Sequence, residues 1–322
     1  MPIDKYEMIK VLEGFPKQCR EALDFPKGLT VSGEIRNIVV AGMGGSAIGG
    51  DILKSYMSSS KIPVFVNRTY NLPGFVNSHS LVFIVSYSGN TEETLSAFKD
   101  AVQKNAKVVC ITSGGDLADL SKKAIKIPAG FQPREALGYL FFPMLGVLYN
   151  SGLIQISNKE LNEALSMLSN ISKFKEEADL IARKIRNKIP IIYSSNILSP
   201  IAYRLKCQLN ENSKQPAFCH SFPEMNHNEL AGYKLMDRKF IAVIIKDDND
   251  HERIKKRMEI CSELMEKTVD TIEVFTKGEH LLTRLFYGIY LGDWISYYAA
   301  MHNRIDPTPV EIIEEMKRRL SK

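Results

Sequence analysis

Cysteine is scarce in this sequence, and its spacing excludes the classes of protein that depend on it. The 322 residues include five cysteines, an odd number, and none lies in a CxxC pair. A secreted disulfide framework or a zinc-binding module needs more closely spaced cysteines. The pattern therefore predicts free, mostly buried thiols in a reducing compartment. The five are Cys19, Cys110, Cys207, Cys219 and Cys261.

Long apolar runs and an excess of one charge are also missing. No stretch approaches the roughly 18 uninterrupted apolar residues of a membrane span, and the charged N-terminus "MPIDKYEMIKVLEGF" has no apolar signal core. The formal net charge is only +5, from 42 basic and 37 acidic residues, without a basic stripe interleaved with aromatics. These absences argue against membrane and nucleic-acid partners. We expect a soluble, cytoplasmic protein.

The first half of the chain has the pattern of a parallel α/β sheet. Apolar, β-branched runs recur at "NIVVAGM", "PVFVNRT", "LVFIVSYSG" and "KVVCITSGG", and "AIKIPA" adds a weaker fifth run. Such short runs are typical of buried parallel strands flanked by helices. A long helix is predicted from Glu135 to Tyr149.

The same plan starts again after a polar helical stretch without glycine or proline. "IPIIYSSN", "KFIAVIIKDD" and "VDTIEVFTK" predict strands, and "SPIAYRLKCQLNENSK" predicts a helix that starts at Ser199-Pro200. Two α/β halves follow, over residues 30–150 and 185–322. We expect an N-terminal helix and first domain over 1–150, a helical connector over 151–184, and a second domain with C-terminal helices over 185–322.

The glycine-rich stretch "GMGGSAIGG" directly follows the first strand. Gly42, Gly44 and Ala47 satisfy the loose dinucleotide pattern GxGxxA, but the second strand ends "VFVNRTY", without the acidic residue that would bind a ribose. A P-loop is excluded because no Gly-Lys-Ser/Thr follows. The remaining interpretation is that Gly44, Gly45 and Ser46 present backbone N–H groups to a polar small molecule at a helix N-terminus.

The end of the third strand, "SYSGNTEET", supports this interpretation. Ser86, Ser88 and Thr91 place three hydroxyls beside a predicted helix start, which is the composition of a phosphate site. A capping box formed by Asn90 and Glu93 is the alternative. Capping needs only one polar residue, so we favour phosphate binding. Without a P-loop lysine, a sugar phosphate fits better than a nucleotide.

These motifs carry a family resemblance. "SYSGNTEET" resembles the phosphate loop of sugar isomerase (SIS) domains, and "GMGGSAIGGDIL" resembles the first loop of the bifunctional phosphoglucose/phosphomannose isomerases. The resemblance continues through "PREALGYL", "YRLKCQLNENSKQPA", "PEMNHNEL" and "DWISYYAAMHNRIDPTPVEIIEEMK", and so spans nearly the whole chain. It implies two SIS domains, each a parallel sheet between helices, in chains paired as homodimers.

The implied reaction interconverts glucose 6-phosphate and mannose 6-phosphate with fructose 6-phosphate through an enediol(ate). The sugar ring must open, a proton must move between C1 and C2, and the developing oxyanion must be stabilised. No redox cofactor is needed, and a metal is optional where a cation supplies the electrostatics. By resemblance, Glu211 in "LNENSK" is the catalytic base. Taken alone, it would be a solvated carboxylate at a helix end.

By resemblance, His227 in "EMNHNE" helps to open the sugar ring and reaches the site from the neighbouring subunit. Asn226 and Asn228 beside it offer partners that could fix one imidazole tautomer. A metal cluster with nearby acidic and histidine side chains is the alternative. The spacing of these side chains, which are His220, Glu224 and Glu229, fits no familiar ligand pattern, so we expect no metal.

Two cations complete the set. By resemblance, Arg134 in "QPREALGYL" stabilises the enediolate; otherwise it would be a surface arginine near a positive helix end. Lys317 on the final amphipathic helix is, by resemblance, the second ring-opening group. A Glu314–Lys317 pair is the plainer interpretation, and Arg318 or Arg319 could take the same role.

The segment "IDPTPVEI" bears on which sugar epimers are accepted. By resemblance, isomerases restricted to glucose carry a glutamine near this helix start, whereas the dual enzymes have a small residue and more room. Thr308 and Val310 stand here without a glutamine, which is consistent with the dual family, and the position that lines the pocket stays open. Two other classes of function remain to be weighed. SIS proteins also include non-catalytic sugar-phosphate sensors, which would not need Glu211, Arg134 and His227 together. The amide- or ether-processing branch would need an added glutaminase domain or different loops, and neither is visible.

Overall fold

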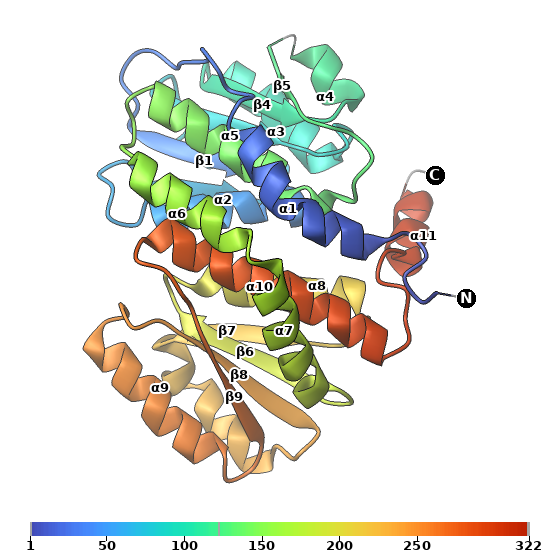
Figure 1. Ribbon diagram of the computed structural model, residues 1–322. Helices are drawn as coiled ribbons and strands as arrows, with labels where there is room; N and C mark the ends of the chain where they lie inside the picture. Colours follow the sequence, from blue (N-terminus) through green and yellow to red (C-terminus); the bar gives the residue numbers. More distant parts are fainter. Residues whose placement is uncertain (1, 122, 321–322) are drawn as a thin grey trace. The chain divides into compact units, whose positions relative to one another are not determined.

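The computed structural model describes residues 2–121 and 123–320, which divide into two compact units (Figure 1). The N-terminal unit contains Gly14–Ser169 together with His280–Thr283, and the rest of the described chain forms the C-terminal unit. Each unit is built on one parallel sheet, so the predicted α/β class with two parallel sheets is confirmed.

The sheet of the N-terminal unit has five parallel strands in the order β2-β1-β3-β4-β5. All five predicted strands are present, although the weak fifth has only two residues. Every residue of β3 is buried, as expected for a central strand covered on both faces. The strands are β1 (Asn37–Ala41), β2 (Val64–Asn67), β3 (Ser80–Val85), β4 (Lys107–Thr112) and β5 (Ile125–Lys126).

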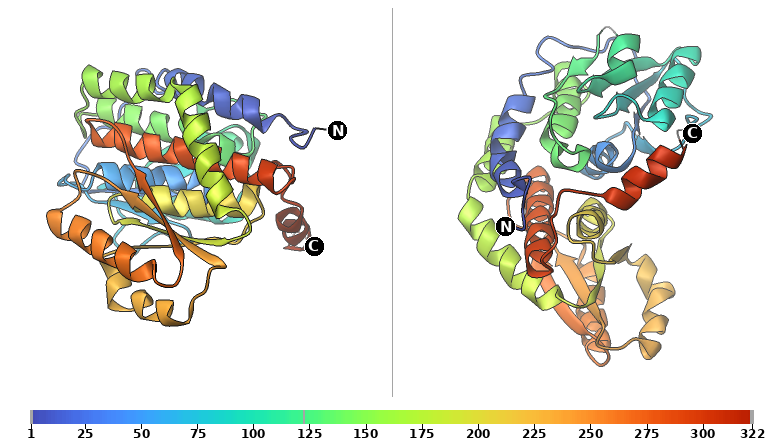
Figure 2. Two further views of the ribbon diagram at one scale, coloured as in Figure 1. Left: turned by 60° about the horizontal axis from the view of Figure 1, so that its bottom comes forward. Right: turned by 90° about the vertical axis from the view of Figure 1, so that its right-hand side faces the viewer.

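Helices cover both faces of this sheet (Figure 2). Because strand side chains alternate, Val39 and Ile84 face α3 (Glu92–Gln103) and α4 (Gly115–Leu120). On the other face, Gly50 of α2 (Ile48–Tyr56) lies against Val40, and Gly49 lies against Met144 of α5 (Leu137–Asn150). The remaining elements are the short turns η1 (Gly44–Ser46) and η2 (Pro133–Glu135), with α6 (Asn158–Leu168) and α1 (Met8–Ala22), whose first residues belong to the C-terminal unit.

The long helix predicted from Glu135 begins two residues later, at Leu137. Gln132 and Glu135 form a capping box that closes η2 first, and the helix follows it. The polar helical stretch is likewise two helices, α6 and α7 (Ile171–Ile185), with a break at Ser169 and Asn170. The two helices fall in different units.

The sheet of the C-terminal unit has four parallel strands in the order β7-β6-β8-β9. Three of them were predicted. The sequence analysis missed β7, "FCHSF", because an edge strand with a histidine, a serine and the exposed Phe218 lacks the apolar run of a central strand. The strands are β6 (Ile189–Ser195), β7 (Phe218–Phe222), β8 (Phe240–Lys246) and β9 (Asp270–Phe275).

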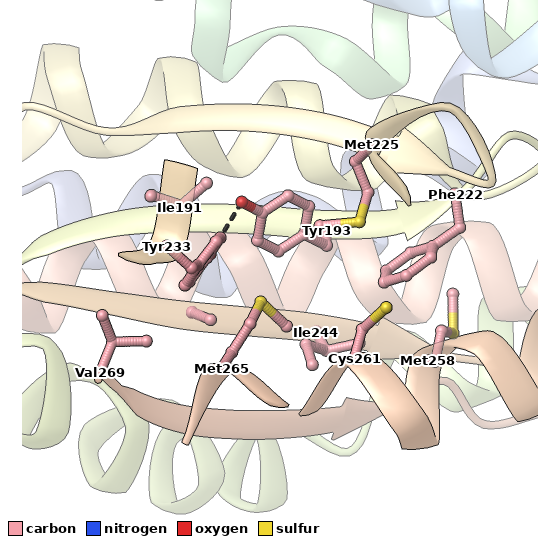
Figure 3. Packing of buried hydrophobic residues seen from close by; sticks show 11 residues of the cluster. Ile191, Tyr193, Phe222, Met225, Tyr233, Ile244, Met258, Cys261, Met265 and Val269 are labelled. Carbon is pink, nitrogen blue, oxygen red and sulfur yellow. Dashed lines mark hydrogen bonds between the residues drawn. The ribbon is translucent and has the colours of Figure 1, made fainter. Parts of the chain in front are cut away.

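One face of this second sheet packs against α9 (Glu252–Met265) and the turns η3 (Glu224–His227) and η4 (Glu229–Leu235). Figure 3 shows Tyr193 and Ile244 of the strands in contact with methionines and a cysteine from these elements. The other helices are α8 (Ser199–Asn212), which starts at Ser199-Pro200 as predicted, α10 (Leu281–His302) and α11 (Glu311–Leu320).

All five cysteines are free thiols, and Cys19, Cys110 and Cys261 are buried. Within the described residues, no helix has both the length and the apolar character needed to cross a membrane.

Candidate active site

The glycine-rich turn and the serine-rich loop meet at one edge of the first sheet. β1 and β3 are parallel neighbours, so their carboxyl ends lie together. The hydroxyl of Ser46, which is buried, accepts a hydrogen bond from the backbone N–H of Tyr87 at 3.1 Å. Two motifs that are 41 residues apart are therefore joined directly.

The hydroxyls of the serine-rich loop occupy different positions. The buried Ser86 donates to the Thr91 hydroxyl at 3.1 Å and accepts from the N–H of Gly89 at 3.1 Å. Ser88 is exposed and accepts from the N–H of Asn90 at 3.3 Å. Ser86 and Thr91 thus form the interior of the loop, and Ser88 lies on its open side.

The capping box considered for Asn90 and Glu93 does not form. Thr91 is the residue before α3, and no side chain of the described residues caps this helix end. Asn90 instead accepts from the N–H of Asp116 at 2.9 Å. The first N–H groups of α3 and the positive end of its dipole therefore face the loop without a side-chain cap, as an anion site requires.

The neighbouring loop presses against this one through glycines. Gly89 has a φ of 76°, and a Cβ built on it would lie 1.8 Å from the carbonyl oxygen of Gly114. Gly115 has a φ of 67°, and its Cβ would lie 2.4 Å from the carbonyl oxygen of Ser88. Only glycine fits at both positions, which fixes the backbone of the serine-rich loop.

The glycine-rich turn approaches the protein itself on one side. A Cβ on Gly45 would lie 2.7 Å from the backbone nitrogen of Arg134, so the turn is in close contact with η2. The N–H of Ser46 bonds to the carbonyl of Met43 at 2.9 Å. Gly44, with a φ of 50°, has no other described atom within 4 Å of its Cβ position and forms the open side of the turn.

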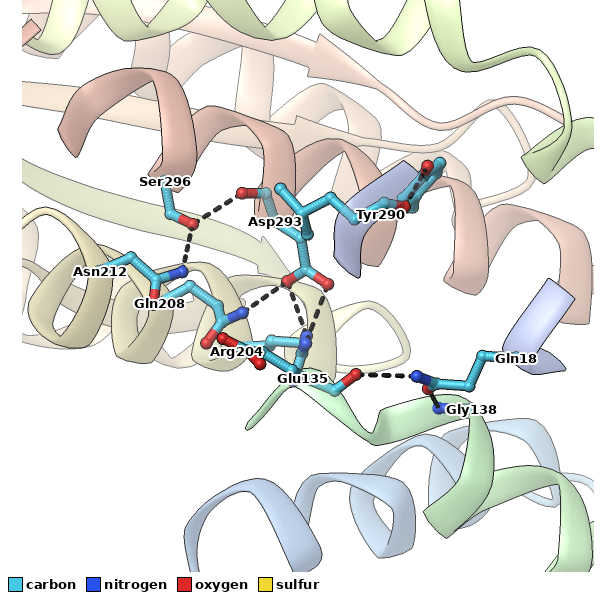
Figure 4. A network of polar contacts seen from close by, with 10 residues as sticks. Gln18, Glu135, Gly138, Arg204, Gln208, Asn212, Tyr290, Asp293 and Ser296 are labelled. Atoms are coloured by element: carbon cyan, nitrogen blue, oxygen red, sulfur yellow. Dashed lines mark hydrogen bonds and ion pairs between the residues drawn. The ribbon is translucent and has the colours of Figure 1, made fainter. Parts of the chain in front are cut away.

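Arg134 is not a surface residue, since its side chain and backbone are together only 3% exposed. Burying a guanidinium is costly, and such groups usually serve a charged partner or a function. Its turn is fixed by Gln18, which donates to the carbonyl of Glu135 at 3.0 Å and accepts from the N–H of Gly138 at 2.7 Å (Figure 4). The sequence analysis gave no signal for Gln18, because this contact joins distant segments.

Tyr87 was also missed, although it lies inside the serine-rich motif. Its hydroxyl accepts from the N–H of Phe131 at 2.8 Å and donates to the carbonyl of Pro128 at 3.1 Å. Burial raises the pKa of Tyr87, which keeps the hydroxyl protonated as a donor. Tyr87 thus connects the serine-rich loop with the segment that leads to Arg134.

Glu211 belongs to the C-terminal unit and is half-buried in the last turn of α8. It is therefore not the fully solvated carboxylate that its position at a helix end would suggest. The helix is held in place by polar residues spaced four apart on α8, which share one face of the helix.

These residues are Arg204, Gln208 and Asn212, and they bond to α10 (Figure 4). The guanidinium of Arg204 donates from Nε and Nη2 to the two carboxylate oxygens of Asp293, each at 2.9 Å, and Gln208 donates to the same group at 2.9 Å. Asn212 donates to the hydroxyl of Ser296 at 2.9 Å. All five side chains are buried, so the rotation of α8, and with it the direction of Glu211, is fixed.

The end of α8 is also connected to the segment before α11. The Nζ of Lys214 lies 2.7 Å from the carbonyl oxygen of Glu211, 3.1 Å from that of Asp306 and 3.3 Å from that of Pro307. A cation at the C-terminus of a helix also complements its dipole. Lys214 therefore links the helix of Glu211 to the loop that continues into Thr308 and Val310, both half-buried.

His227 ends η3 and is exposed. The expectation that Asn226 and Asn228 fix its tautomer is wrong. Asn226 donates to the sulfur of Cys261 at 2.8 Å, and Asn228 donates to Glu224 at 2.9 Å. In the part of the chain that the structure describes, no group of three or more His, Cys, Asp or Glu residues is placed to hold a metal ion.

Lys317 is exposed on α11. Its neighbours Arg318 and Arg319 both pair with Glu315. Among residues 2–121 and 123–320, no ion pair to Lys317 forms, so the plainer Glu314–Lys317 pairing is not observed. Within the described residues, Lys317 is the cation of this trio for which no carboxylate contact is observed.

The α/β fold and the serine-rich loop define a class of protein, the SIS-domain sugar isomerases. The SIS domain family matches residues 34–141, and the family described as the bacterial phospho-glucose isomerase C-terminal SIS domain matches residues 174–320. The C-terminal domain of glucosamine-fructose-6-phosphate aminotransferase from Francisella tularensis has the same fold, with a TM-score of 0.72 over 95% of this chain and 98% of that chain at 20% identity.

Two relatives narrow the class. The bifunctional phosphoglucose/phosphomannose isomerase of Caldicellulosiruptor bescii is 41% identical, over 98% of this chain and 99% of its own length. The enzyme of that name from Thermoplasma acidophilum is also 41% identical, over 90% of this chain and 91% of its own. The chain belongs to the bifunctional phosphoglucose/phosphomannose isomerase family.

Proposed function

We propose that this enzyme interconverts glucose 6-phosphate and mannose 6-phosphate with fructose 6-phosphate. The observation that carries the proposal is the arrangement in the N-terminal unit. The hydroxyls of Ser86, Ser88 and Thr91 and an uncapped helix N-terminus lie on a loop bonded to the Gly44–Ser46 turn, and the buried Arg134 packs against that turn. These groups support a phosphate site on this loop, and the turn bonded to the loop is in backbone contact with Arg134, as we expect of a site for a phosphorylated sugar.

In the proposed reaction, Glu211 takes the proton from C2 of the open-chain aldose. The electrons of the C–H bond form the C1=C2 double bond, and the C1 carbonyl oxygen becomes an oxyanion that Arg134 stabilises. Return of the proton to C1, with transfer of the O2 proton to O1, gives the ketose. Because C2 is planar in the enediolate, the glucose and mannose epimers lead to the same intermediate.

We assign ring opening to His227 and Lys317, with His227 supplied by the partner in a homodimer. The exposed imidazole of His227, on a turn whose neighbouring residues are anchored, supports a role outside its own chain's hydrogen-bond network. Thr308 and Val310 follow the segment that Lys214 links to α8, and we propose that this segment leaves room for both epimers. The division into domains over 1–150, 151–184 and 185–322 stays a prediction.

The decisive experiment adds fructose 6-phosphate to the purified, metal-stripped protein and follows the products by NMR. Appearance of both aldose phosphates establishes the dual activity, and glucose 6-phosphate alone would restrict it to one epimer. Glu211→Gln should abolish turnover and leave the dissociation constant for fructose 6-phosphate nearly unchanged. Binding without any turnover by the parent protein would instead identify a sugar-phosphate sensor.

A further inference from the structure

The turn that carries His227 is anchored at every neighbouring residue. Met225 is fully buried in the core of the C-terminal unit (Figure 3), and Asn226 is bonded to Cys261 of α9. Within the described residues, the imidazole of His227 makes no hydrogen bond or ion pair of its own. Its position is therefore determined by its neighbours, and the question is which contact directs it.

On the C-terminal side of His227, Glu229, two residues later, reaches into the core of the C-terminal unit. The hydroxyl of Tyr193 lies 2.6 Å from Oε1 of Glu229 and 2.8 Å from the hydroxyl of Tyr233. Tyr193 belongs to β6 and is 0% exposed, and Tyr233 is 4% exposed. The carboxylate of Glu229 thus reaches a hydroxyl inside the core of the C-terminal unit.

The protons of this cluster can be assigned. A carboxylate only accepts, so Tyr193 gives its single proton to Glu229, and Tyr233 must donate to Tyr193. Burial raises the pKa of Tyr233 to about 12 and raises that of Tyr193 as well, so both hydroxyls keep their protons at neutral pH. The result is a directed chain of hydrogen bonds from Tyr233 through Tyr193 to the side chain of Glu229.

We propose that Glu229 is a positioning residue for His227. By accepting a hydrogen bond from the hydroxyl of Tyr193, the carboxylate of Glu229 fixes the backbone at the start of η4. This sets the direction in which His227 projects. Glu229 does not touch the sugar in this proposal. The inference rests on the ring-opening role proposed for His227. The carboxylate of Glu229 is bonded to the hydroxyl of Tyr193.

The test compares four variants of the full-length protein. Tyr193→Phe removes one hydroxyl and leaves the ring in the core, Glu229→Ala removes the carboxylate, and Glu229→Gln keeps an oxygen that can accept from Tyr193. Tyr233→Phe is the matched control, because it leaves the Tyr193–Glu229 bond in place. We expect Tyr193→Phe and Glu229→Ala to lower kcat by about tenfold to a hundredfold with little change in KM, and Glu229→Gln to recover most of it.

Two readouts separate positioning from a general loss of structure. Slower ring opening should reduce the primary isotope effect on kcat with [2-²H]glucose 6-phosphate, because proton abstraction is then no longer the slow step. In a His227→Ala background, Tyr193→Phe should cause no further loss, since it acts through His227.

The possible failures are distinct. An unimpaired Tyr193→Phe enzyme, or a loss that multiplies with that of His227→Ala, would overturn the positioning role while leaving the isomerase intact. An unimpaired His227→Ala enzyme would remove the ring-opening role itself, and this inference with it. If Tyr193→Phe does not fold, the two Glu229 variants make the same comparison, because Glu229 is only half-buried and its substitution disturbs the core less.

Discussion

Arg204 of α8 and Asp293 of α10 form a two-point ion pair in the interior of the C-terminal unit, with side chains only 5% and 3% exposed. Such a pair contributes little net stability over an apolar one, but losing one partner leaves a buried charge uncompensated. Its main consequence here is geometric, because it fixes the helix on which Glu211 lies.

Asp293→Asn should therefore be strongly destabilising, by about 3–5 kcal/mol, measured as the change in the free energy of unfolding in urea. The double variant Arg204→Met with Asp293→Leu should recover most of that loss, because no buried charge remains. A double variant as unstable as the single one would contradict this account. The kcat of the double variant should still fall, since α8 loses the contacts that set its rotation.

Gly45→Ala should impair the enzyme without unfolding it. The added methyl group would lie 2.7 Å from the backbone nitrogen of Arg134 and 2.8 Å from its Cα, and backbone atoms cannot rotate away. The glycine-rich turn and η2 must then separate, and a displacement of this size at a site can lower kcat/KM about a hundredfold. Gly74→Ala is the control, because no atom of residues 2–121 and 123–320 beyond its chain neighbours lies within 4 Å of its Cβ position. Equal kcat/KM values for the two variants would contradict the close contact.

Asp270 predicts a pH dependence of stability. Hydrogen bonds and charge from Lys188 and Arg238 lower the pKa of this carboxyl, which joins the amino ends of β6, β8 and β9. A lowered pKa means that the stabilisation is complete above the pKa of the unfolded chain and is lost as the pH falls through the folded value. Asp270→Asn should therefore be less stable than the parent at pH 7 and equal to it in strong acid. Thermal unfolding measured at intervals from pH 7 down into strong acid tests this, because the difference in stability should shrink only below the unfolded pKa; Lys188→Met should behave alike.

Sequence patterns predicted the central strands and the place of the serine-rich loop before a helix, because both depend on neighbouring residues. The run "LVFIV" has one reasonable structure in a protein of this composition, and "SYSGNT" combines hydroxyls with a helix start. The edge strand "FCHSF" was missed because it pairs with a neighbour on one side only. Fewer of its residues are buried, so its sequence lacks a continuous apolar run.

The contacts that orient the site are of another kind. Gln18 to Glu135, Ser46 to Tyr87 and Tyr193 to Glu229 join segments that are 117, 41 and 36 residues apart, respectively. Nothing in the local sequence distinguishes the partner that such a side chain selects. The expectation for Asn226 failed for that reason, since adjacency to His227 in sequence did not decide where its amide points.

Lys214 contacts the loop before α11 through carbonyl oxygens of Asp306 and Pro307, and main-chain oxygens are common to every amino acid. The attachment is thus indifferent to which side chains follow. A library randomised at Thr308 and Val310 would keep the anchor of the loop while altering its surface. The role proposed for this segment in accepting both epimers can therefore be tested by substitution without removing the contacts of Lys214 to the main chain.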